Sequence, residues 1–293
     1  MQDGSHVRAT TANPKYTVAR CRIAGTEDRE RSVKRLVVSM FAVAVLCGFG
    51  MPAVAYAQGD EIQVYDGGLA QKGVYNLTWH NNFTPKGIKT APAGLVTADK
   101  SFNGVTEWAY GVSNWFEAGL YLPLYTHDKN LGFGIDGFKL RGLAATPNGG
   151  DRKVAFGLGM ELSFNRERWD EKAVTSEFRP IVAFHINPKF DVILNPILDT
   201  AYDGFSNLVF APSARFAYNP TDTWALALET YSDFGALKGF EKAADQSHQI
   251  YGVLGHTTKS GFEWEFGAGV GLTDAADKFV LKLILAKDLN KIK

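Results

Sequence analysis

The residues of this sequence that are best suited to metal or cofactor chemistry are scattered. The six histidines are His6, His80, His127, His185, His248 and His256. None belongs to an HExxH or other paired spacing, so we expect no bound metal. Asp128, Lys129 and Asn130 begin like a calcium loop, but its twelfth position is Lys139 instead of glutamate, which excludes that motif. We expect no cofactor.

Catalytic arrangements are equally weak. The sequence contains no GxSxG, GxxxxGK[ST] or dinucleotide-binding fingerprint. Ser247 and His248 are neighbours, so on a strand they point to opposite faces and make a poor nucleophile and base. Glu263 and Glu265 would share one strand face about 7 Å apart, a spacing that suits a pair of catalytic acids. Two acids on a barrel wall explain them better. We predict that the protein is not an enzyme. An outer-membrane lipid hydrolase ranks third among the possible functions, after the channel and the closed barrel described below.

The largest group of charged residues recurs at every second position of strand-like segments, which places them on one face. If the strands close into a β-barrel, as the strand pattern described below predicts, this face lines the lumen. The predicted lumen-lining residues are Glu107, Glu117, Tyr121, Lys139, Arg141, Glu161, Glu177, Arg179, Asp199, Arg215, Glu229, Glu263, Glu265 and Lys282. With Asp191 and Asp233 on the same face, ten acids oppose five bases. That excess predicts a channel that favours cations or neutral polar solutes. The alternative is a network that only fills and braces a closed barrel.

Three tyrosines suggest a second property of the same interior. Tyr121, Tyr125 and Tyr231 are expected to line the loop-side mouth and to stack on an aromatic or hydrophobic solute.

The segment Asn103–Tyr125 shows most clearly which elements position these side chains. Its two halves alternate large apolar residues with small or polar ones, which predicts two strands. A three-residue turn at Ser113–Trp115 keeps the large apolar residues on one face. Each strand has about ten residues, the length of a tilted membrane-crossing strand.

The same pattern recurs along the chain and predicts an all-β fold. The twelve expected strands are Gly73–Asn82, Asn103–Val112, Phe116–Tyr125, Ile135–Thr146, Lys153–Asn165, Ser176–Asn187, Phe190–Tyr202, Leu208–Asn219, Thr223–Phe234, Gln246–Thr257, Phe262–Leu272 and Lys278–Asp288. Short turns alternate with mostly longer loops, including Phe83–Phe102 and Thr126–Gly134. An even strand count with this alternation is typical of a closed antiparallel transmembrane β-barrel.

The faces of the strands favour lipid over a soluble sandwich, which is the alternative for such alternation. The polar face is rich in glycine and alanine, as a crowded lumen requires. Aromatic residues stand near strand ends, as in interfacial girdles. They are Trp108, Phe116, Phe164, Phe190, Tyr218, Trp224 and Trp264. Pro180, Pro196 and Pro212 lie sixteen residues apart in adjacent strands, and proline lacks the ladder donor, so we expect a bulge or weakened pairing there.

The N-terminal part has a different character. Lys34 and Arg35 precede the apolar run Leu36–Gly50, and a small-residue ending leads to Ala57. These three parts predict a secretory signal peptide cleaved after Ala57. The alternative is a membrane-anchor helix, which needs a longer apolar run. Translation is then expected to begin near Val33. Both cysteines, Cys21 and Cys47, would be removed with this segment, which leaves a mature chain with a net charge of −4 and no disulfide or thiol chemistry.

Three stretches resemble a known family. They are Glu107–Tyr125, the RPIV of Arg179–Val182 and the NPILD of Asn195–Asp199. In these, and over about Glu61 to Leu289, the chain resembles the outer-membrane transporter proteins grouped with the phenol-degradation MetA-pathway family. The resemblance implies a bacterial outer-membrane barrel with a role in solute passage. Such barrels usually end on an aromatic residue that the assembly machinery recognises, whereas this chain ends Asn290-Lys291-Ile292-Lys293.

Together these observations predict two parts, residues 1–57 as extension and signal peptide and residues 58–293 as the barrel. The expected function is passive passage of a small solute across the bacterial outer membrane. A closed structural barrel without transport is the alternative. The expected partners are outer-membrane lipid, the small-molecule solute and the barrel-assembly machinery. The formal net charge of zero argues against nucleic acid.

Overall fold

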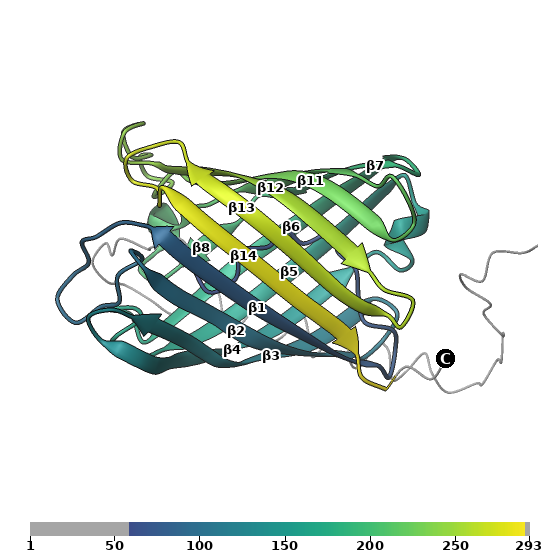
Figure 1. Ribbon diagram of the computed structural model, residues 1–293, viewed down its shortest axis with the longest axis horizontal. Helices are drawn as coiled ribbons and strands as arrows, with labels where there is room; N and C mark the ends of the chain where they lie inside the picture. The colour runs from purple at the N-terminus through teal and green to yellow at the C-terminus, as the bar shows by residue number, and fades with distance from the viewer. Residues whose placement is uncertain (1–58, 291–293) are drawn as a thin grey trace, which may run out of the picture. The chain divides into compact units, whose positions relative to one another are not determined.

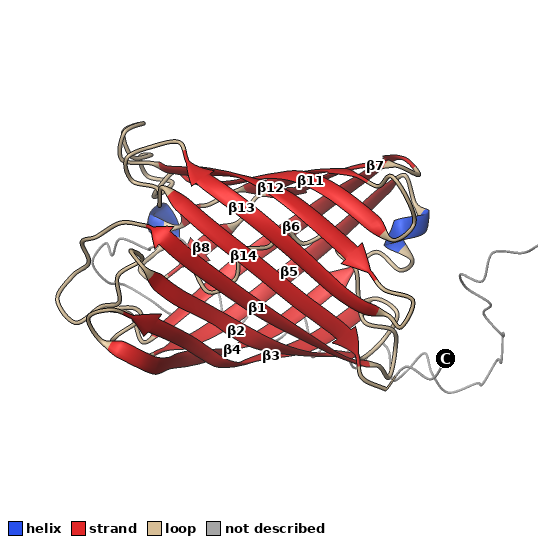
Figure 2. Ribbon diagram, viewed as in Figure 1, coloured by secondary structure: helices blue, strands red, loops and turns tan. Residues whose placement is uncertain are grey.

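The computed structural model describes residues 59–290, and these residues form a closed antiparallel β-barrel (Figures 1 and 2). The expectations about residues 1–57 lie outside the described part. The strands are β1 (Tyr75–Lys86), β2 (Ser101–Gly111), β3 (Phe116–Asp128), β4 (Gly132–Ala145), β5 (Val154–Asn165), β6 (Val174–Asn187), β7 (Phe190–Asn195), β8 (Leu198–Thr200), β9 (Val209–Phe210), β10 (Ser213–Tyr218), β11 (Trp224–Asp233), β12 (Ser247–Thr257), β13 (Phe262–Gly271) and β14 (Phe279–Asp288).

Closure is made by pairing the first strand with the last. Asn76 of β1 lies opposite Asp288 of β14, and the ladder continues to Phe83 opposite Leu281. On the other side, β5 pairs with β6 and completes the ring. β7 and β8 are two parts of one wall strand, as are β9 and β10, so the wall has twelve strands. The predicted fold class is therefore confirmed.

The prolines account for the two divided strands. The pairing of β6 with β7 ends at Val182 opposite Leu194 and resumes with β8 at Phe178 opposite Leu198. Pro196 lies in the first interruption and Pro212 in the second, between β9 and β10. Because proline has no N–H for the ladder, the regular pairing stops there. The weakened pairing expected at Pro196 and Pro212 is confirmed, whereas Pro180 pairs regularly with Leu158 of β5 and loses its pairing only on the side that faces Pro196.

The hairpin between β3 and β4 differs from the expectation. The loop predicted at Thr126–Gly134 is short, because β3 continues to Asp128 and β4 begins at Gly132. Asp128 Oδ1 accepts the backbone N–H groups of Asn130 at 2.7 Å and Leu131 at 2.8 Å. Gly132 has a φ of 68°, which glycine adopts at no steric cost. The residues that begin like a calcium loop therefore form a tight turn.

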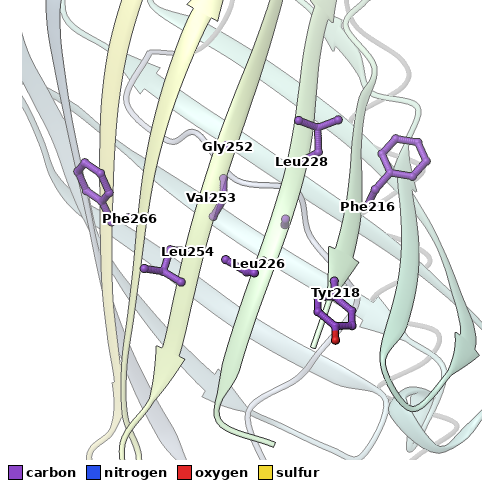
Figure 3. A pocket seen from close by; sticks show the side chains of 9 residues that line it. Phe216, Tyr218, Leu226, Leu228, Gly252, Val253, Leu254 and Phe266 are labelled. Atoms are coloured by element: carbon purple, nitrogen blue, oxygen red, sulfur yellow. The ribbon is translucent and has the colours of Figure 1, made fainter. Parts of the chain in front are cut away.

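The outer face of the wall is apolar and exposed. Trp108, Phe156 and Phe266 expose 46%, 60% and 44% of their surface, whereas the alternating residues Ala109, Ala155 and Gly267 are buried inside. Across β10 to β13 this face is hollowed around Gly252, between Leu228, Leu254 and Phe266 (Figure 3). A side chain added at Gly252 would meet open space. A continuous apolar exterior is what a wall in contact with hydrocarbon requires.

Candidate functional site

The barrel encloses a part of its own chain. Residues 59–72, which we call the lumenal segment, precede β1 and belong to no strand. Asn82 of β1 donates to the carbonyl oxygens of Gly59 (2.9 Å) and Asp60 (3.0 Å). At the other end, the N–H of Gly73 donates to the carbonyl of Gly111 at 2.7 Å. The segment therefore runs through the lumen from the level of Asn82 to the rim that carries the short turns.

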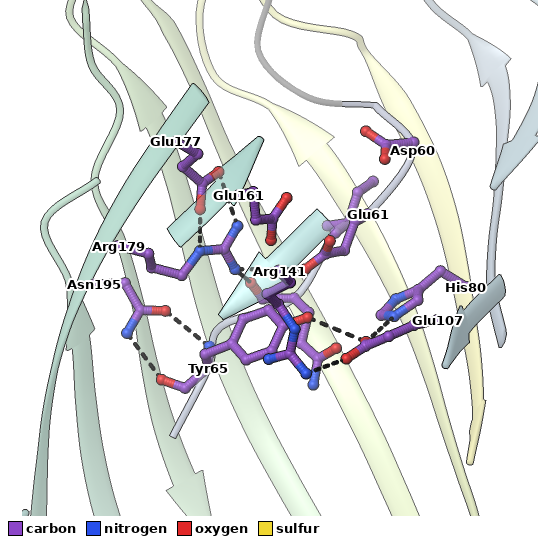
Figure 4. A network of polar contacts seen from close by, with 12 residues as sticks. Asp60, Glu61, Tyr65, His80, Glu107, Arg141, Glu161, Glu177, Arg179 and Asn195 are labelled. Atoms are coloured by element: carbon purple, nitrogen blue, oxygen red, sulfur yellow. Dashed lines mark hydrogen bonds and ion pairs between the residues drawn. The ribbon is translucent and has the colours of Figure 1, made fainter. Parts of the chain in front are cut away.

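The backbone of the lumenal segment is fixed to the wall at its middle. Asn195 of β7 accepts from the N–H of Tyr65 and donates to the carbonyl of Tyr65, both at 2.8 Å (Figure 4). Ile62 packs with Tyr251, Val253 and Val280 on one side of the lumen. Val64 packs with Leu143 and Ile181 on the other. Apolar contacts on opposite walls wedge the segment across the interior.

The inward face of β2 to β6 carries a dense ionic network, which we call wall A. Arg141 contacts both Glu107 and Glu117. Arg179 Nε lies 2.5 Å from Glu177, and Lys139 Nζ lies 3.4 Å from Glu161. The second partners of Lys139 and Arg179 come from the lumenal segment. Asp60 lies 2.7 Å from Lys139, and Glu61 lies 3.6 Å from Arg179.

Tyr65 of the lumenal segment stands at the centre of wall A (Figure 4). Its hydroxyl lies 2.7 Å from the hydroxyl of Tyr121 and 3.3 Å from Glu107. Its ring faces the guanidinium groups of Arg179 and Arg141, at 4.6 and 5.3 Å from the ring centroid. Cation–π contacts of this kind are favourable where both groups are desolvated. Buried His80 adds a contact of 3.3 Å with Glu107.

The inward face of β10 to β14 carries a second network, which we call wall B. Lys282 Nζ lies 2.6 Å from Glu229 and 2.9 Å from Glu265. Arg215 contacts the same two carboxylates, at 2.8 Å from Glu265. Among the polar contacts of residues 59–72, this network receives the carbonyl of Ile62, which accepts from Lys282 at 3.1 Å. Wall B thus pairs its charges within itself.

Glycines on the inward face give these long side chains room. A Cβ on Gly267 would lie 2.8 Å from Lys282 Cε and 2.9 Å from its Cγ. A Cβ on Gly269 would lie 2.3 Å from the ring of Tyr251. Both contacts are closer than packed carbon atoms tolerate. The absence of a side chain at these positions is therefore a requirement of the filled lumen.

The predicted lumen-lining residues fall into three groups by exposure. The buried ones are Glu107, Glu117, Tyr121, Lys139, Arg141, Glu161, Glu177, Arg179, Glu229 and Lys282. Asp199, Arg215 and Glu265 are partly exposed, and Glu263 is exposed at the turn-side end of β13. Asp199 lies opposite Glu177 in the ladder between β8 and β6.

The expectation that Tyr125 lines the lumen was wrong. The ladder between β2 and β3 shifts register between Tyr121 and Leu124, and this irregularity exchanges the faces of the residues that follow. Leu124 is buried inside with Val105 and Tyr121. Tyr125 lies on the outer side, where its hydroxyl accepts from Trp79 Nε1 at 2.8 Å and its ring lies beside Phe102. Tyr121 is fully buried, so it offers no open face at the mouth.

Sequence reasoning missed the lumenal segment altogether. A signal was available, because Glu61, Gln63 and Tyr65 alternate with Ile62 and Val64 before the turn formers Gly67 and Gly68. Alternation of this kind indicates an extended segment with two different faces. Nothing in it shows that both faces contact the interior of the barrel.

Two loops at the loop-side end of the barrel contact wall A and each other. Trp169 of loop 166–173 packs against the cluster of Val105, Tyr121 and Leu124. Arg168 lies 3.0 Å from Asp136, and its carbonyl accepts from the N–H of Val96 in loop 87–100 at 2.9 Å.

An ion pair between a half-exposed lysine and a buried aspartate joins loop 87–100 to the neighbouring turn. Lys129 Nζ lies 3.1 Å from Asp99 Oδ2. The hydrogen bond from Lys129 holds the pKa of Asp99 below its ordinary value. The loops of the mouth are thus tied to each other as well as to the wall.

Within residues 59–290, no group of three or more His, Cys, Asp and Glu side chains is placed to hold a metal. In the same range, no helix is long and apolar enough to cross a membrane. Of the two glutamates considered as a catalytic acid pair, Glu263 and Glu265, the second forms ion pairs with Arg215 and Lys282. The charged interior is therefore the feature to interpret.

A closed twelve-stranded antiparallel wall with an apolar exterior and a charged interior is the architecture of the transmembrane β-barrels. The chain is similar in fold to the COG4313 outer membrane channel from Pseudomonas putida F1, with a TM-score of 0.56 and 12% sequence identity over 78% of this chain and 100% of that one. It also matches the NanC porin (TM-score 0.48, 9% identity, 73% of this chain and 100% of that one). The match to the KdgM porin has a TM-score of 0.49 and 7% identity over 73% of this chain and 99% of that one.

These identities are low, so the first likeness concerns the fold alone and the other two support no further comparison. No protein-family model matches the chain. No curated protein matches it either. Membership of the phenol-degradation MetA-pathway family stays a prediction.

Proposed function

We propose that the protein is an outer-membrane channel for the passive passage of small solutes. The observation that carries the proposal is the distribution of side chains, which is the reverse of that in a soluble protein. Exposed Trp, Phe and Leu side chains lie outside and buried ion pairs lie inside. A wall of this kind is stable only when its exterior meets hydrocarbon and its interior meets water or polar groups. Small cations and neutral polar molecules are the proposed solutes, because carboxylates outnumber bases in the interior.

The proposal includes location and processing. Export would use the signal peptide ending at Ala57, and the mature chain would be inserted by the barrel-assembly machinery. We propose no enzymatic role. The aromatic or hydrophobic solute suggested by the sequence would have to be recognised without the outward-facing Tyr125.

Ion conductance across a planar lipid bilayer is the direct test of the channel. The purified mature protein should produce discrete conductance steps, and liposomes containing it should swell in small neutral sugars. A shift in gel mobility between unheated and boiled samples would first establish that the preparation is a folded barrel. Folded protein that neither conducts ions nor swells liposomes would contradict the proposal.

A closed structural barrel is the second candidate. It is favoured by the lumenal segment, which occupies the interior and is wedged against both walls. The same two measurements separate the candidates, since a bracing barrel would be folded and heat-modifiable but would not pass ions or sugars.

A further inference from the structure

We propose that Asp60 and Glu61, the two carboxylates of the lumenal segment, set the ion preference of the lumen. The inference rests on the proposed channel function and deepens it. It assigns selectivity to a segment outside the barrel wall, which can be changed without altering any strand.

The first step is the position of the two carboxylates. The side chains of Asp60 and Glu61 are 1% and 0% exposed. Each points to a base of wall A, Asp60 to Lys139 at 2.7 Å and Glu61 to Arg179 at 3.6 Å. Charges held this deep are poorly screened by salt, so their field acts on any ion that passes beside the segment.

The second step is the balance of charge. The bases of the two networks are Lys139, Arg141, Arg179, Arg215 and Lys282. Their carboxylate partners are Asp60, Glu61, Glu107, Glu117, Glu161, Glu177, Glu229 and Glu265. Eight acids against five bases leave three negative charges in excess, and without Asp60 and Glu61 only one remains. The segment therefore supplies two of the three excess negative charges in these two networks.

The third step is that the segment has anchors that do not depend on these carboxylates. Its backbone is bound by Asn82, by Asn195 and by Lys282, and Ile62 and Val64 pack on opposite walls. Replacing Asp60 and Glu61 with their amides keeps the size and shape of both side chains. The double variant D60N/E61Q should therefore change charge while the segment stays in place.

The experiment measures the reversal potential of the mature protein in a planar bilayer under a KCl gradient. At a separation of about 10 Å in water, one charge changes the local concentration of a monovalent ion by about twofold, in opposite directions for cations and anions. The wild type should prefer K⁺. The D60N/E61Q variant should lower the permeability ratio of K⁺ to Cl⁻ by roughly tenfold.

Two further variants separate charge from packing. Asp66→Asn removes an exposed charge of the same segment and should leave the ratio within about twofold of wild type. The exchange D60E/E61D keeps both negative charges of the segment while changing the length of both side chains, and it should retain most of the wild-type preference. Heat-modifiability of each variant confirms that the barrel has folded.

The outcomes are distinguishable. Conductance with an unchanged K⁺ preference in D60N/E61Q would overturn this assignment while leaving the channel intact. A loss in D60E/E61D as large as that in D60N/E61Q would also overturn it, because shape rather than charge would then control selectivity. A folded wild type without conductance would overturn the proposed function and this assignment with it.

Discussion

The two charged walls of the lumen satisfy their bases in different ways. In wall B, Arg215 and Lys282 share the carboxylates of Glu229 and Glu265, all from the barrel wall. In wall A, Lys139 and Arg179 each have one carboxylate from the wall and one from the lumenal segment. Wall B is complete without the segment, whereas wall A is not.

This difference indicates what the lumenal segment does. A buried charge is costly unless it is paired and hydrogen-bonded. The bases of wall A therefore have all their carboxylate partners only when residues 59–72 occupy the lumen. The presence of the segment should thus stabilise that side of the barrel. We expect wall A to be the side on which variants have the larger effects.

The largest expected effect on stability is at Arg141. Arg141→Met removes the base between Glu107 and Glu117, both of which are buried. Leaving buried carboxylates without their partner should lower the free energy of unfolding by about 3–5 kcal/mol. Urea unfolding in detergent micelles, followed by tryptophan fluorescence, measures the loss.

Arg215→Met in wall B is the matched control for Arg141→Met. The Arg215 side chain is 12% exposed, and Lys282 still holds both of its carboxylates after the change. We expect a loss of about half that of Arg141→Met. Equal losses of unfolding free energy in the two variants would contradict the claim that wall A depends more strongly on its ion pairs than wall B.

A smaller effect is expected at Gly267 in wall B, where packing rather than pairing is tight. Gly267→Ala places a methyl group against the Lys282 chain and should cost about 1–3 kcal/mol. Gly252→Ala, on the hollowed outer face (Figure 3), meets open space and should change stability by less than about 0.5 kcal/mol. If the two alanine variants unfold at the same urea concentration, the lumen is less filled than described.

The smallest expected effect is at Tyr65. Tyr65→Phe removes the hydroxyl that contacts Tyr121 and Glu107 but keeps the ring between the two guanidinium groups. The loss should be about 1 kcal/mol, the usual contribution of one hydrogen bond. Tyr75→Phe on the outer face, where the side chain is half exposed, should be neutral. A Tyr65→Phe variant as stable as wild type would show that the hydroxyl contributes nothing to seating the segment.

Much of the wall could be predicted from the sequence because alternation is a local property. Glu161 in β5 and Arg179 in β6 each follow the period-2 pattern of their own strand, and that pattern alone places their side chains on the inner face. The partners of Lys139 and Arg179 could not be predicted in this way. Asp60 and Glu61 lie more than seventy residues away and meet these bases only after the barrel has closed.

The failure at Leu124 and Tyr125 has a different cause. Period 2 holds only while the ladder is regular, and the irregularity after Tyr121 reverses the faces of the following residues. Tyr121 itself was placed correctly on the inner face, but its partner Tyr65 comes from the segment that the sequence did not reveal.

Single-channel conductance of a variant that lacks residues 59–66 tests the central claim most directly. The account predicts a folded, heat-modifiable barrel whose conductance is several times that of the wild type, because an extended chain would no longer occupy the lumen. The loss of Asp60 and Glu61 should also weaken its preference for cations. A folded variant with the same conductance as the wild type would contradict the claim that the lumenal segment fills the passage.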